Sequence, residues 1–113
     1  MKREFIYFKT FDKNWNNMGL TDDDLAALEN ILMENPTAGK VIQGTGGIRK
    51  MRFALPNNKG KSGGARVLFI DYISMETTVM LNAYSKSERD NITDNEKIQL
   101  KKIADGISRE LRR

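Results

Sequence analysis

The sequence predicts a single α+β domain that spans residues 1–113. Its length of 113 residues suits one domain with its own core. Three strand-like segments follow one another between residues 48 and 85 with short connections, as in an antiparallel meander. Segments with helical spacing precede and follow that meander. The predicted order is therefore an N-terminal strand, two helices, an antiparallel sheet meander and a C-terminal helix.

The N-terminal third is predicted to hold one strand and two helices. Residues 3–11 are rich in aromatic side chains and are typical of a strand. Residues 12–17 form a short predicted helix around Trp15. Thr21 is a good N-cap, and the three aspartates that follow it (Asp22, Asp23 and Asp24) suit the positive end of a second helix, which explains them better than a metal cluster does. Asn35-Pro36 ends that helix.

The rest of the chain supplies the meander and the last helix. Residues 48–55 alternate, with Met51, Phe53 and Leu55 on one face and Lys50 and Arg52 on the other. A polar hairpin loop is predicted for residues 56–64, a central strand for 66–73, a turn for 74–77 and a further strand for 78–85. Residues 94–112 read as a helix with an apolar stripe formed by Leu100, Ile103, Ala104, Ile107 and Leu111.

The positive charge of the chain is local. The formal net charge is +4, and residues 39–66 hold a cluster of lysines and arginines with no aspartate or glutamate. Elsewhere, carboxylates slightly outnumber the bases. A local cluster of cations on a small protein favours a polyanionic partner, and nucleic acid is the first candidate.

The composition excludes several classes of function. The chain contains no cysteine and no histidine, so disulfides and thiolate catalysis are excluded, and the usual general base and the commonest metal ligand are missing. No cofactor or metal site is predicted. The N-terminus lacks the features of a signal peptide, and no apolar run approaches the roughly 20 residues that a membrane span needs. We therefore expect a cytoplasmic protein.

Five residues of the meander are candidates for a site. Lys50 and Arg52 are two residues apart on a strand, so they share a face with about 7 Å between them, close to the phosphate spacing of an extended single strand. The alternative is a solvated outer face. Arg66 opens the next strand and is placed to approach them across the hairpin, and Tyr84 and Lys86 share one face at the end of the following strand.

Three segments together resemble a known family. They read VIQGTGGIRKMRFA, GKSGGARVLFIDY and NAYSKSERDNITDNEKIQL, and they are similar to the HigB branch of the RelE/ParE-like toxins of bacterial type II toxin–antitoxin systems. The resemblance covers nearly the whole chain. It implies a RelE-like fold whose antiparallel sheet carries a basic cleft, and an activity that cuts mRNA in the ribosomal A site.

The resemblance also implies roles for particular residues. Lys50 and Arg52 match two basic positions of one strand, Arg66 matches the arginine that opens the next strand, and Lys86 falls where the family has a basic residue. Where the family has a tyrosine near the final helix, this chain reads Asn91-Ile92-Thr93, so Tyr84 is the candidate to replace it. The predicted catalytic residues are thus Lys50, Arg52, Arg66, Lys86 and Tyr84, and the predicted RNA-binding residues are Arg49, Lys59 and Lys61.

The implied partners are the ribosome, mRNA and a HigA-like helix-turn-helix antitoxin. Lysine and arginine stabilise the charge that builds on a phosphate under attack by a ribose 2′-hydroxyl, but they are poor bases. An enzyme without histidine should therefore depend on the ribosome to hold the message in a reactive geometry. Two alternatives stay open: a ParE-like toxin that inhibits a topoisomerase, and a nucleic-acid-binding protein without catalysis.

Overall fold

The computed structural model describes residues 2–54, 64–86 and 91–112. The elements in chain order are β1 (Glu4–Tyr7), α1 (Lys9–Asn17), α2 (Asp22–Glu34), β2 (Lys40–Val41), β3 (Arg49–Phe53), β4 (Ala65–Tyr72), the 3-10 helix η2 (Ile73–Met75), β5 (Thr77–Ser85) and α3 (Asp94–Leu111). Of the predicted hairpin loop 56–64, all but Gly64 lies outside the described residues.

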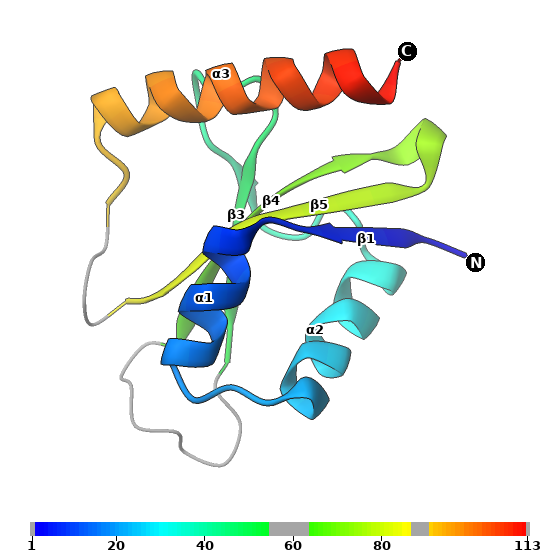
Figure 1. Cartoon of the computed structure of the whole chain (residues 1–113), viewed down its shortest axis with the longest axis vertical. Coiled ribbons are helices and arrows are strands. Elements are labelled where there is room, and N and C mark those ends of the chain that lie inside the picture. The colour runs from blue at the N-terminus through cyan, green and yellow to red at the C-terminus, as the bar shows by residue number, and fades with distance from the viewer. Residues whose placement is uncertain (1, 55–63, 87–90, 113) are drawn as a thin grey trace.

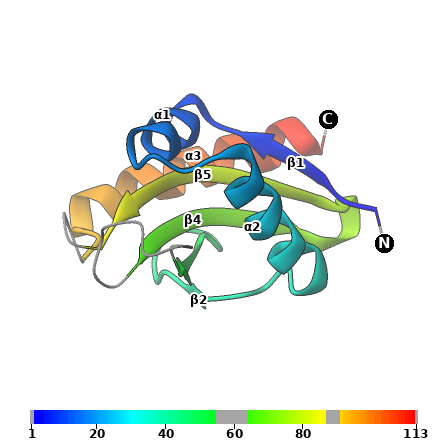
Figure 2. The same ribbon diagram turned by 90° about the horizontal axis from the view of Figure 1, so that it is seen from below.

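One five-stranded sheet organises the molecule, and its strand order is β1-β5-β4-β3-β2. β3, β4 and β5 form the predicted antiparallel meander, whereas β1 pairs with β5 in parallel. Figure 2 shows β1 lying beside β5 at one edge. α1 and α2 cover one face of the sheet and α3 covers the other (Figure 1). The predicted α+β class is confirmed.

The N-terminal strand is shorter than predicted. The prediction placed residues 3–11 in a strand, but β1 ends at Tyr7 and α1 already begins at Lys9. Phe11 and Trp15 explain the difference, because they are one helical turn apart, stack with ring centroids 5.3 Å apart, and are both buried. Helical spacing of two aromatic anchors therefore outweighs the strand preference of the aromatic run.

Both longer helices begin with a reciprocal cap. At α2 the Asp24 amide donates to the Thr21 hydroxyl (3.2 Å), and the Asp24 carboxylate accepts from the Thr21 amide (2.8 Å). Thr93 and Glu96 repeat this arrangement at α3. Each pair satisfies two backbone donors that a helix start leaves open. The helix explanation of the aspartates at residues 22–24 therefore holds for Asp24.

The short strand β2 was not predicted. It pairs Lys40 with Lys50 and Val41 with Arg49, and both of its residues are exposed. Two exposed residues carry no periodic pattern of apolar side chains, so sequence spacing contains no signal for it.

The two faces of the sheet bury two separate clusters. Between the sheet and helices α1 and α2 lie residues that include Phe11, Trp15, Leu28, Leu32, Met51, Phe53, Val67, Phe69 and Met80. Between the sheet and α3 lie Ile48, Leu68, Ile70, Val79, Leu81, Tyr84 and Ala104. Odd-numbered residues of β3 and β4 thus point towards α1 and α2, and even-numbered residues point towards α3. α3 packs loosely, because Ala104 is its only buried residue and Ile103 of its apolar stripe remains 37% exposed.

Within the described residues, none of the helices has the length and apolar character that crossing a membrane requires.

Candidate functional site

Three cations lie on the α3 face of the meander. Arg52 of β3 is directly opposite Arg66 of β4, and Lys50 lies two residues from Arg52 on the same face. The intervening Met51 and the following Phe53 are 6% and 5% exposed on the other face. The predicted separation of basic and apolar faces along this strand is confirmed, and so is the approach of Arg66 to Arg52.

The alignment continues across β5 because of a bulge. Arg66 is opposite Tyr84, and Leu68 is opposite Asn82, but Phe69 is opposite Met80, so Leu81 is an extra residue in β5. One extra residue reverses the faces of all residues that follow it. Tyr84 is thereby turned to the α3 face, in line with Arg66. We call Arg52, Arg66 and Tyr84 the transverse row.

The transverse row places like charges side by side. Directly opposite residues of antiparallel strands have Cβ atoms about 4.5–5.5 Å apart, and like charges in that position destabilise a sheet. Arg52 is exposed and Arg66 is half-buried. A phosphate between two guanidinium groups can accept paired hydrogen bonds from each. Two guanidinium groups directly opposite each other therefore suit an anionic ligand.

Gly64 fixes the end of the hairpin next to the row. Its φ of +73° lies in the left-handed region, and a Cβ atom built on it would lie 2.7 Å from the Phe53 carbonyl oxygen. Any side chain there would push β3 and β4 apart. The Gly64 carbonyl also accepts a hydrogen bond from the Lys86 amide (3.2 Å). Lys86, which is exposed, is thus held at the same end of the sheet as Arg52 and Arg66.

Tyr84 is the least exposed of the predicted catalytic residues. Its side chain is 7% exposed and belongs to the cluster under α3. It lines a cavity of about 170 Å³ between the sheet and the start of α3, and a second of about 240 Å³ towards α1. These two cavities give a ligand access to Tyr84, a feature that the sequence did not indicate.

Arg49 is separated from the other predicted residues. Its guanidinium donates to the carbonyl oxygens of Thr37 (3.0 Å) and Gly39 (3.2 Å), in the segment that follows α2. Being odd-numbered on β3, it points to the face opposite the transverse row. The contacts give Arg49 a structural role in holding that segment to β3, and its predicted binding to RNA has no support from its position. Lys59 and Lys61 lie outside the described residues.

Sequence reasoning missed the polar residues around the smaller cavity. That cavity is lined by Leu68, Asn82, Tyr84, Ile92, Asn95, Glu96, Gln99 and Leu100. Asn82 accepts hydrogen bonds from the Asn14 side chain (2.7 Å) and from the Ala83 amide (2.8 Å). One signal was available, because an asparagine within an otherwise apolar strand is unusual and calls for a reason.

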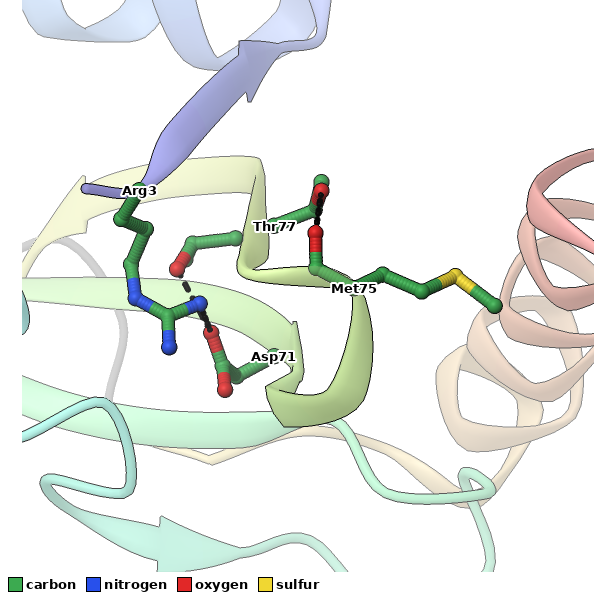
Figure 3. A network of polar contacts seen from close by, with 5 residues as sticks. Arg3, Asp71, Met75 and Thr77 are labelled. Carbon is green, nitrogen blue, oxygen red and sulfur yellow. Dashed lines mark hydrogen bonds and ion pairs between the residues drawn. The ribbon is translucent and has the colours of Figure 1, made fainter. Parts of the chain in front are cut away.

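The opposite end of the sheet holds a different arginine (Figure 3). Arg3 donates to the Asp71 carboxylate at 2.7 Å, and the two side chains are 2% and 3% exposed. The Thr78 hydroxyl donates to the same oxygen at 2.6 Å. This pair is enclosed and far along β4 from Arg66. Among the described residues, no three potential ligands gather into a metal site.

A comparison with protein families gives a match over nearly the whole chain. The family model described as "RelE toxin of RelE / RelB toxin-antitoxin system" matches residues 5–111. The matched range begins in β1 and ends at the last residue of α3, so it includes every strand and helix described above.

Proposed function

The chain belongs to the RelE family of toxins of toxin–antitoxin systems, and from this premise we propose that it is an mRNA endonuclease that acts on the ribosome and thereby inhibits translation. We assign it to the HigB branch. Its partners are then a HigA-like helix-turn-helix antitoxin, the ribosome and the message, and its place of action is the cytoplasm.

The observation that carries this proposal is the opposition of Arg52 and Arg66 on the α3 face. A polyanion can bind both guanidinium groups, and Lys50 on the same face extends the cationic surface along β3. Lys86, anchored beside Gly64, adds a further cation at the same end. These are the four basic residues that the family resemblance assigns to the active site.

The proposed chemistry is attack of a ribose 2′-hydroxyl on the adjacent phosphorus. The bond between phosphorus and the 5′-oxygen of the next nucleotide breaks, and a cyclic phosphate remains. Arg66 and Arg52 bind the phosphate oxygens and stabilise the extra negative charge of the transition state. The chain has no histidine, so the side chain that most often serves as general base is missing. Positioning of the message by the ribosome would then supply part of the rate acceleration.

Primer extension on two copies of one transcript tests the proposal. One copy carries a ribosome-binding site and the other does not, and both are present in the same translation reaction with the purified toxin. We expect cuts only in the translated copy. Equal cutting of both copies would contradict dependence on the ribosome, and an intact transcript in growth-arrested cells would favour the topoisomerase-inhibiting alternative. A neighbouring reading frame for a small helix-turn-helix protein would support the HigA-like partner.

A further inference from the structure

We propose that the cavity between β4, β5 and the start of α3 receives one nucleobase of the RNA, and that Asn95 and Gln99 read its edge. The cavity is lined by these two amides and by Leu68, Asn82, Tyr84, Ile92, Glu96 and Leu100. This inference rests on the proposed function, since it assumes that single-stranded RNA lies across the transverse row. The base held in this cavity would select the position of the cut.

The cavity lies within one nucleotide of the proposed phosphate site. Leu68 follows Arg66 by two residues on the same face of β4, and Tyr84 is directly opposite Arg66 on β5. Both Leu68 and Tyr84 line the cavity. Two residues of a strand span about 6.6–6.8 Å, so a nucleotide whose phosphate is bound by Arg66 has its base within reach of the cavity lining.

The size of the cavity suits a single flat ring system. Its volume is about 170 Å³, below the roughly 300–1,000 Å³ of pockets that hold drug-sized ligands. Leu68, Ile92 and Leu100 supply apolar walls from three different segments. Sequence-specific proteins bind single-stranded RNA by drawing unstacked bases into such sites, where apolar or aromatic side chains cover the ring faces.

The polar groups at the cavity suit a base better than a phosphate. Asn95 and Gln99 are four residues apart, so they lie on the same side of α3 one turn from each other. Each carries a carbonyl acceptor and an amide donor with no net charge, the combination that pairs with base edges. Asn82 is already engaged by Asn14 and by the Ala83 amide, so we assign it the positioning of the cavity floor.

The experiment compares cutting preferences rather than total activity. Purified wild type, Asn95→Ala, Gln99→Ala and the double variant act on a translated message library with randomised codons, and sequencing of the new ends gives the base frequencies around each cut. Asn16→Ala is the matched control, because Asn16 is an exposed amide of α1 on the other side of the sheet. Alanine is a good helix former, so all three substitutions should keep the fold. Melting temperatures check this.

We expect the wild type and Asn16→Ala to share a strong preference at one position beside the cut. A base contact of this kind discriminates roughly ten- to hundredfold, and the double variant should lose most of that ratio while it continues to cut. An unchanged preference in a double variant that cuts would overturn this inference and leave the proposed function intact. A uniform loss of cutting at all sites would also overturn it, because the amides would then serve general binding. A wild type that cuts no message overturns the proposed function, and this inference falls with it.

Discussion

At one end of β4, Arg3 donates to the Asp71 carboxylate at 2.7 Å inside the protein, whereas at the other end Arg66 is directly opposite Arg52. The first arginine is enclosed and has a carboxylate partner. The second is only half-buried and lies directly opposite another arginine. Burial of a charge requires a partner of opposite sign. Placing like charges together lowers the stability of the free protein and is expected where a ligand of opposite charge binds.

This difference indicates a structural role for the end of β4 at Asp71 and a ligand-binding role for the end at Arg66. The Arg3–Asp71 pair connects the beginning of β1 to β4, which are separated in the sheet by β5. Its loss should unfold the protein. The proposed role of the transverse row is to bind an anionic ligand, so its loss should leave a folded but inactive protein. The predictions below test this division in order of decreasing expected effect.

The largest effect on stability should come from breaking the buried pair. Asp71→Ala leaves the Arg3 guanidinium enclosed without its carboxylate, which costs roughly 3–5 kcal/mol of unfolding free energy for such pairs. Chemical denaturation measures it. The double variant Arg3→Met with Asp71→Leu replaces both charges by apolar groups and should recover most of the loss. A single variant that melts like the wild type would remove the contrast between the two ends.

The next effect concerns activity at the transverse row. Arg66→Ala should lower ribosome-bound cleavage by about 100-fold or more, as for loss of one group that stabilises transition-state charge. Arg66→Lys should fall between the two, because an ammonium cannot bind phosphate through paired hydrogen bonds. The unfolding free energy of both variants should stay within about 0.5 kcal/mol of the wild type. A destabilised Arg66→Ala with full specific activity would reverse the assignment.

A third prediction sharpens the contrast by perturbing the row without touching its charges. Gly64→Ala combines a left-handed backbone with a clash against the Phe53 carbonyl oxygen, and strained positions of this kind cost about 1–3 kcal/mol. Gly19→Ala is the matched control, because Gly19 has φ +74° but nothing within 4 Å of the added atom. We expect Gly64→Ala to be the less stable of the two in thermal melts and to lose cleavage as the hairpin shifts. Equal melting temperatures would show that backbone conformation alone matters there.

The smallest effect concerns a carboxyl group whose partner is neutral. The Tyr7 hydroxyl donates to the Glu29 carboxylate, and burial raises the pKa of Glu29 above its ordinary value of about 4.5. A raised pKa means that the folded state prefers the protonated form, so this contribution to stability is present below about pH 4.5 and is lost as pH rises through the raised pKa. Glu29→Gln removes the dependence.

The measurement for Glu29 is the difference in unfolding free energy between Glu29→Gln and the wild type at several pH values. This difference should grow in favour of the variant as pH rises above about 4.5, while the other carboxylates cancel because both proteins share them. A difference that shrinks with rising pH would show that the folded state favours the charged form of Glu29. The Tyr7 hydroxyl would then stabilise that charge as an arginine does for Asp71.

Local patterns predicted the parts of the molecule that depend on neighbouring residues. The alternation from Lys50 to Phe53 placed the two faces of β3 correctly, and Thr21 marked the start of α2. Pairings between residues far apart in the chain could not be predicted from the sequence. Arg3 and Asp71 are 68 positions apart, and each alone looks like an ordinary surface charge. Arg49 belonged to the basic cluster by sequence, but its position on β3 turned it to the other face.

The place of Tyr84 in the candidate site depends on the bulge at Leu81, which is a feature of the pairing between β4 and β5. Alternation predicted that Tyr84 and Lys86 share a face, yet nothing in the sequence of β5 revealed that this face is the one with Arg66. Counted from Val79 in regular alternation, Tyr84 would lie on the face of α1 and α2. Leu81 changes this count.

The extra residue Leu81 can be described as a shift of half a period in the pattern of β5. Up to Met80, the side chains of β5 alternate in the register set by pairing with β1. From Asn82 on, they alternate in the register that brings Tyr84 opposite Arg66. If Leu81 paired with Leu68 in regular register, Ala83 would lie opposite Arg66 in place of Tyr84, without any change of side chain. A bulge at this one position is thus a route by which proteins of this shape can place an aromatic group at the site, and comparisons of their sequences need to align β5 separately on the two sides of the bulge.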